Sequence, residues 1–172
     1  SSLGKYTRGH VNPAVTLIEL RLGYIGKKTA FFYIISQIIG SIFAGYFLKF
    51  TIGNYAAIGA NLPLLKSNFN YLLSFFTEFI LSALLAIVII RVAYIEKLSL
   101  NFLAASCGLL VCVEVIVFGA ITGAAMNPIR AIGPHFAADF PGGLLIYIFG
   151  PTLGFLFITE VYIFFRNKIN TK

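Results

Sequence analysis

The amino-acid sequence predicts an all-α membrane protein, and three observations carry this prediction. The 172 residues are 59% hydrophobic and 11% charged, with a mean hydropathy of +0.90, which is too apolar for a soluble domain of this size. Four apolar runs are long enough to cross a hydrocarbon core, which needs roughly 20 residues of helix. These runs cover residues 30–48, 71–90, 102–121 and 144–165. Two shorter helical segments each follow an Asn-Pro pair.

The two Asn-Pro pairs predict where two half-helices begin. Asparagine caps free backbone N–H groups and proline fits the first helical position, so helices should start at Pro13 and Pro128. The segments 13–22 and 128–138 are too short to span a bilayer. Each therefore fits a re-entrant half-helix whose non-helical approach is buried in protein.

Small residues in the long apolar runs predict close packing between helices. They recur at a spacing of four residues, which lets neighbouring backbones approach where no hydrophobic drive acts between helices. The sets are Ser36 with Gly40 and Ala44, Ser41 with Gly45, and Gly150 with Gly154.

The basic residues predict the orientation in the membrane. If the first residues are cytoplasmic, ten basic residues fall inside and two outside, as the positive-inside rule expects. The inside set is Lys5, Arg8, Arg21, Lys27, Lys28, Arg91, Lys97, Arg166, Lys168 and Lys172, and the outside set is Lys49 and Lys66. Both ends of the chain are therefore expected to be cytoplasmic, and the plasma membrane is the expected location.

The sequence offers no catalytic or metal-binding constellation. Its basic residues are scattered at the ends of apolar runs, which argues against binding to nucleic acid. His10 and His135 are isolated, and no metal-ligand spacing or phosphate loop is present. Cys107 and Cys112 fall in one apolar run, where small buried side chains are expected rather than a disulfide. We therefore expect neither an enzyme nor a cofactor nor a metal site.

The two Asn-Pro segments indicate an internal repeat of opposite orientation about the membrane midplane. A single domain, 1–172, would consist of the remainder of a first repeat (1–48), an extracellular loop (49–68) and a second repeat (69–172). Before its half-helix the second repeat has two spans, the first of which carries Glu78, whereas only 11 residues precede Asn12. Two further spanning helices are therefore expected before Ser1, and a sealed pore is expected to need them.

The predicted arrangement builds the centre of a pore. Half-helices entering from opposite faces would bring the Asn12 and Asn127 amides, and two positive dipole ends, to one point. Such a site donates hydrogen bonds to water and small neutral solutes, and it repels cations. Arg130 lies one turn into the second half-helix, and an arginine at membrane depth is by default a functional candidate that lines a wet cavity. It would add fixed positive charge at a narrowing.

The stretches HVNPAVT and GAAMNPIRAIGP resemble the two signature loops of the aquaporin, or major intrinsic protein, family. The resemblance continues through ISQIIGS, FFTEF and YIFGPTLG. It implies an aquaporin-like inverted repeat, here with four transmembrane helices and two re-entrant half-helices and without the first two helices. It also implies a homotetramer in the lipid bilayer.

The resemblance further implies roles for single residues. The pore motifs would be Asn12-Pro13-Ala14 and Asn127-Pro128-Ile129, where Ile129 replaces the usual alanine. The selectivity filter would include Val115, Ala124 and Arg130, and the loops would be supported by His10, Gln37 and Glu78.

The filter residues resemble those of the nodulin-like branch of the family. Val115 stands where water-selective members usually carry histidine, and Ile148 replaces a tryptophan common in strict water channels. The resemblance implies passive transport of water and small uncharged solutes such as glycerol, urea or metalloid acids.

Three alternatives stay open: a strictly water-selective channel, a secondary transporter with broken helices, and a non-conducting fragment of a channel. The resemblance assigns no role to Arg8, Glu19 or Glu114. For Glu114, a packed and hydrogen-bonded side chain and a pore-adjacent one are both open.

Overall fold

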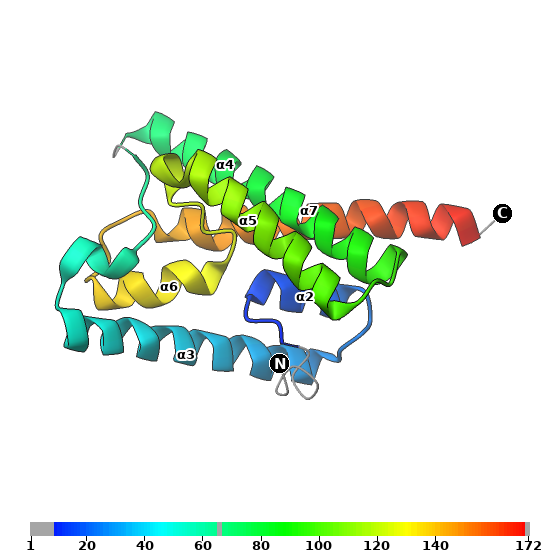
Figure 1. Cartoon of the computed structure of the whole chain (residues 1–172), viewed down its shortest axis with the longest axis horizontal. Coiled ribbons are helices and arrows are strands. Elements are labelled where there is room, and N and C mark those ends of the chain that lie inside the picture. The colour runs from blue at the N-terminus through cyan, green and yellow to red at the C-terminus, as the bar shows by residue number, and fades with distance from the viewer. Residues whose placement is uncertain (1–8, 65–66, 171–172) are drawn as a thin grey trace.

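The computed structural model describes residues 9–64 and 67–170, and the described chain is built from helices. Figure 1 shows the short helices α2 and α6 lying nearly end to end, with α3 along one side and α4, α5 and α7 along the other. The elements are α2 (Pro13–Arg21), α3 (Lys27–Ile52), the 3₁₀ helix η1 (Tyr55–Gly59), α4 (Asn68–Ile89), the π-helix η2 (Ile90–Ile95), α5 (Leu100–Thr122), α6 (Pro128–Ala137) and α7 (Leu144–Asn170). Lys5, Arg8, Lys66 and Lys172 lie outside the described residues.

Four helical segments are long and apolar enough to cross a membrane, which confirms the predicted all-α membrane fold. They are α3, α4 continued by η2, α5 and α7. Helices α4 and α5 begin before their apolar runs because serine caps extend them. Ser67 accepts a hydrogen bond from the backbone N–H of Asn70, and Ser99 accepts one from that of Phe102. Hydropathy detects only the apolar middle of such a helix.

Glycines allow close approaches between helices. A methyl group added at Gly150 of α7 would lie 3.0 Å from Cβ of Glu78 on α4, and one added at Gly45 of α3 would lie 2.5 Å from the carbonyl oxygen of Gly133 on α6. The stripe of Ser36, Gly40 and Ala44 is different, because a methyl group at Gly40 would meet nothing within 4 Å. The prediction of close packing is therefore wrong for this stripe among the described residues.

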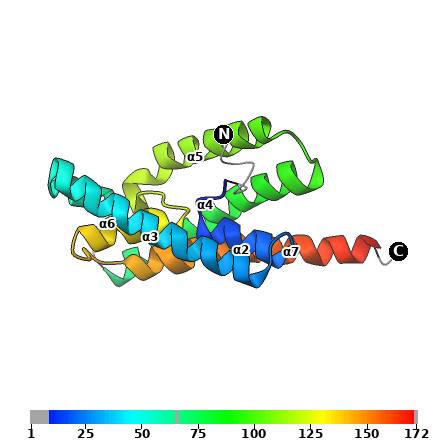
Figure 2. The ribbon, with the colours of Figure 1, turned by 90° about the horizontal axis from the view of Figure 1, so that it is seen from below.

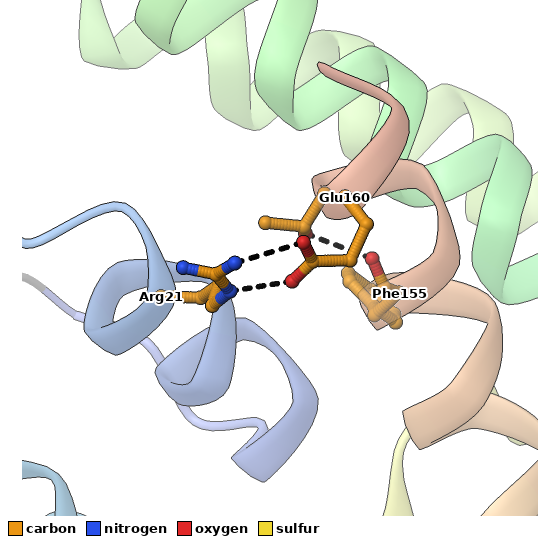
Figure 3. A network of polar contacts seen from close by, with 4 residues as sticks. Arg21, Phe155 and Glu160 are labelled. Carbon is orange, nitrogen blue, oxygen red and sulfur yellow. Dashed lines mark hydrogen bonds and ion pairs between the residues drawn. The ribbon is translucent and has the colours of Figure 1, made fainter. Parts of the chain in front are cut away.

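An ion pair fastens the end of α2 to α7. Arg21 donates from Nε to Oε1 of Glu160 at 2.5 Å and from Nη2 to Oε2 at 2.9 Å, as Figure 3 shows. The hydrogen bond that Arg21 donates to Glu160 raises the pKa of Arg21. A positive charge at the C-terminus of a helix also complements the helix dipole. Beyond this pair, the C-terminal part of α7 extends past the other helices in both views (Figures 1 and 2).

Gly154 provides a test of the α4–α7 packing. A side chain there would collide with the backbone carbonyl of Phe79, so Gly154→Ala should lower the free energy of unfolding by about 1–3 kcal/mol. The measurement is an SDS titration in mixed micelles followed by far-UV circular dichroism. Gly40→Ala is the matched control, because it adds the same methyl group in open space. Equal losses of stability in both variants would contradict the packing described here.

Candidate functional site

Each half-helix begins at the asparagine that the sequence predicts. Asn12 and Asn127 both have extended backbones, with φ of −147° and −156°, and proline occupies the first helical position after each. Oδ1 of Asn12 accepts from the N–H of Ala14 at 3.0 Å, and Oδ1 of Asn127 accepts from that of Ile129 at 3.1 Å. Each side chain therefore caps its own helix.

The two asparagines also bind the two loops to each other. Nδ2 of Asn12 donates to the carbonyl oxygen of Met126 at 2.9 Å, and Nδ2 of Asn127 donates to that of Val11 at 3.0 Å. Each asparagine thus bonds the residue that precedes the other asparagine. We call this reciprocal contact the junction. It brings the N-termini of α2 and α6 together, although the two motifs are far apart in the sequence.

A network of neutral side chains supports the first loop. Nε2 of Gln37 donates to the carbonyl oxygen of His10 at 2.9 Å and to Oγ1 of Thr16 at 3.1 Å. Nδ1 of His10 lies 2.8 Å from the same Thr16 hydroxyl, and the imidazole stacks on Tyr33 with ring centroids 4.6 Å apart. Thr16 was not among the predicted residues. The structure brings it together with His10 and Gln37, which were.

A buried carboxylate supports the second loop. Glu78 is fully buried in α4, and its two oxygens accept from the backbone N–H groups of Ala125 at 2.9 Å and Met126 at 2.8 Å. Ala124 and Met126 have left-handed backbones, with φ of 44° and 51°. Such conformations are costly for residues other than glycine and persist where surrounding contacts hold them. The carboxylate of Glu78 is one of those contacts.

Ser41 links α3 to the second half-helix. Its hydroxyl donates to the carbonyl oxygen of Ile129 and accepts from the N–H of Gly133 at 2.9 Å. The sequence marked Ser41 only as a small packing residue. The signal that could have indicated this contact is a small polar residue in α3 together with a glycine in the second half-helix, where the two backbones can approach.

The three predicted filter residues have different environments. Arg130 is exposed and, with Asn127, Ile129 and Val11, lines a cavity of about 300 Å³ beside α3. Val115 is 40% exposed on α5 and does not line this cavity. Ala124 is fully buried and packs in the core with Ala14 and Met126.

Two further buried polar residues differ in their hydrogen bonding. His135 is buried, with its ring nitrogens 2.8 Å from the carbonyl oxygen of Ala131 and 3.0 Å from that of Gly142, so it holds the turn after α6. Glu114 is also buried, but neither carboxylate oxygen has a hydrogen-bond partner in the described part of the chain. Of the interpretations left open for Glu114, a packed side chain is confirmed by its burial, whereas the hydrogen bond expected with it is absent among these residues. In the same residues no group of three or more potential ligands could hold a metal ion.

Two half-helices that meet at their N-termini between spanning helices define a membrane protein with an inverted repeat. The chain belongs to the major intrinsic protein family, the family of the aquaporins, because the family model matches residues 2–162. Together with the four apolar helices, this makes it an integral membrane protein.

Curated relatives place the chain near the nodulin-like branch. It is 32% identical to Nodulin-26 of Glycine max and 31% identical to Aquaporin NIP3-1 of Oryza sativa, covering 94% of this chain in each case. A match to the Probable aquaporin AqpM of Archaeoglobus fulgidus has 32% identity over 89% of this chain. The chain spans 58%, 51% and 65% of the lengths of these three relatives, respectively. The predicted resemblance to the nodulin-like branch is thus confirmed.

A solved structure shares the fold. The aquaglyceroporin from Plasmodium falciparum superposes with a TM-score of 0.72 and 22% identity, covering 90% of this chain and 71% of the other. The crystal structure of that protein therefore has the same arrangement of helices.

Replacing Glu78 tests how the second loop is held. Glu78→Gln puts an amide NH₂ group against backbone donors, so the unfolding free energy should fall by about 1–3 kcal/mol. The backbone amides of Ala125 and Met126 should also exchange hydrogen faster, as measured by mass spectrometry in detergent. Glu96→Gln is the control, because Glu96 is an exposed carboxylate paired with Arg91. Unchanged exchange at both amides in Glu78→Gln would refute this role.

Proposed function

We propose that this chain forms a passive channel for water and small uncharged solutes that excludes ions and protons, and that it is not an enzyme. The observation that carries the proposal is the junction. Each asparagine amide nitrogen bears two hydrogens, of which one is donated across the junction to a carbonyl oxygen. The second hydrogen of each amide is available to a permeating molecule. The names of the relatives as aquaporins support the same function.

Ion exclusion follows from the charges around the junction. A helix N-terminus carries the equivalent of roughly half a positive charge, and two of them face each other here. A cation at the junction would lose its hydration without gaining an oppositely charged partner. A water molecule that accepts hydrogen bonds from both asparagines is poorly oriented to relay a proton. Arg130 would add a full positive charge near Asn127, with which it lines one cavity.

The solute range is proposed from the size and polarity of the filter. Val115 would offer an apolar wall to a carbon chain, while the guanidinium group of Arg130 would donate to hydroxyl groups. Glycerol, urea and undissociated metalloid acids combine these properties. We propose that they pass together with water. We also propose that the protein forms homotetramers in the plasma membrane, with both chain termini on the cytoplasmic side.

Ion exclusion is tested by adding a negative charge at the junction. A carboxylate about 4 Å from a permeating cation contributes on the order of 4 kcal/mol at an effective dielectric constant of 20. In protein expressed from its complete reading frame, Asn127→Asp should therefore raise cation conductance at least roughly tenfold, and Arg130→Val should raise it less. Planar-bilayer currents give the measurement, with the exposed Asn101→Asp as the matched control. A robust sodium or proton current through the parent protein would refute ion exclusion.

The solute range is tested by restoring a narrow filter. Val115→His adds a bulky polar ring, so glycerol permeability should fall at least roughly tenfold while water permeability is retained. Stopped-flow light scattering of proteoliposomes measures both permeabilities. Val113→His, on the opposite side of α5, should leave the ratio of glycerol to water permeability unchanged. If the parent already excludes glycerol and urea, a strict water channel is the better answer.

A further inference from the structure

A second cavity lies where α4 gives way to α5, beyond the first turn of α2. Its volume is about 500 Å³, larger than that of the cavity beside Asn127 and Arg130. Its walls are the loop before α2, α2 itself, the end of α4 with η2, and the start of α5. The lining residues are Gly9, His10, Val15, Glu19, Ile89, Ala93, Tyr94, Leu100, Leu103 and Cys107.

The polar part of this wall includes His10 and a pair formed by Glu19 and Tyr94. The Tyr94 hydroxyl donates to Oε1 of Glu19, and the Tyr94 ring stacks on Tyr24 with centroids 5.0 Å apart. The opposite wall is apolar, since Leu100, Leu103 and Cys107 form it. The cavity therefore has one face that accepts hydrogen bonds and one face that suits a carbon chain.

The π-helix η2 positions Tyr94 for this contact. The N–H of Glu96 donates to the carbonyl oxygen of Arg91 at 2.9 Å, the i to i+5 pattern of a π-helix. An extra residue in the turn changes the direction of the side chains that follow, and π-helical turns are frequent at functional sites. Here the change brings a tyrosine of the α4 segment against a carboxylate of α2.

Glu19 also lies on a face of α2 that leads away from the junction. Asn12 caps α2, Val15 lies one turn further on, and Glu19 lies one turn beyond Val15. Residues three and four apart in a helix lie on one face. Val15 and Glu19 both line the cavity, so this face runs from the asparagine donors to the carboxylate acceptor.

We propose that Glu19 and Tyr94 form a second solute subsite, which binds small neutral molecules that carry several hydrogen-bond donors. The proposal rests on the channel function proposed above and names the class of solute that this part of the path favours. The junction and Arg130 supply donors, whereas the carboxylate of Glu19 supplies acceptors. Polyols, urea and undissociated hydroxides can bind at both places. A molecule of similar size that only accepts hydrogen bonds finds no partner in Glu19.

Cys107 makes this subsite measurable without any flux. It lines the cavity, and Cys112 is the only other cysteine of the chain. In a Cys112→Ala background, the rate of Cys107 modification by methyl methanethiosulfonate is followed by mass spectrometry in proteoliposomes. Glycerol should slow the reaction. Dimethyl sulfoxide, which only accepts hydrogen bonds, should not.

Two conservative variants and one control test the role of the pair. Glu19→Gln removes the charge, and Tyr94→Phe removes only the hydroxyl. A hydrogen bond to a charged group exceeds a neutral one by about a fivefold change in affinity, so the half-protecting glycerol concentration should rise about fivefold in Glu19→Gln. Tyr94→Phe should act in the same direction, because it removes the hydroxyl that donates to Oε1 of Glu19. Glu96→Gln changes an exposed carboxylate outside the cavity and should leave protection unchanged.

The results separate this proposal from the channel function. Glycerol flux in the parent combined with equal protection in the parent, Glu19→Gln and Tyr94→Phe would overturn the subsite and leave the channel standing. Protection that depends on Glu19 and Tyr94, in protein that passes no solute at all, would support the subsite and overturn the channel. Equal protection by glycerol and dimethyl sulfoxide would overturn the donor preference.

Discussion

The reciprocal bonds of Asn12 and Asn127 are the interaction on which the rest of the structure depends. Each side chain satisfies an N–H of its own half-helix and a carbonyl oxygen of the opposite loop. Loop groups that face protein rather than the proposed pore cannot be satisfied by bulk water, and each one left unsatisfied would cost several kcal/mol. Replacing one asparagine therefore leaves an N–H group unsatisfied in its own half-helix and a carbonyl oxygen unsatisfied in the opposite loop. The spanning helices, Gln37, Ser41 and Glu78 all act to keep this one contact in place.

The two loops reach the junction by different physical means, although their motifs are alike. Neutral groups, His10, Thr16 and Gln37, hold the first loop. A carboxylate holds the second, whose backbone is left-handed at Ala124 and Met126. Hydrogen bonds to a charged acceptor are stronger than neutral ones, which suits the more strained loop. The two halves are thus held by groups of different charge, and the half that carries Arg130 is the one held by a carboxylate.

The sequence was most informative where structure is set locally. Capping and the fixed φ of proline act within one turn, so Asn12-Pro13 and Asn127-Pro128 predict both helix starts. Hydropathy likewise predicts the four spans, because it too is a property of the local sequence. The contact of Glu19 with Tyr94 could not be predicted, because a π-helical turn has no local signature in this sequence and the partners come from different helices. The small-residue stripe at Gly40 failed because spacing does not reveal which face of a helix has a neighbour.

A double-mutant cycle on the two asparagines tests the central claim most directly. Asn12→Ala, Asn127→Ala and the double variant would be unfolded by SDS titration in mixed micelles. Because both side chains belong to one contact, the account predicts that the double variant loses less stability than the sum of the single losses, by roughly 0.5–3 kcal/mol. Losses that add to within about 0.3–0.5 kcal/mol would mean that the two half-helices are held independently, and would contradict the account.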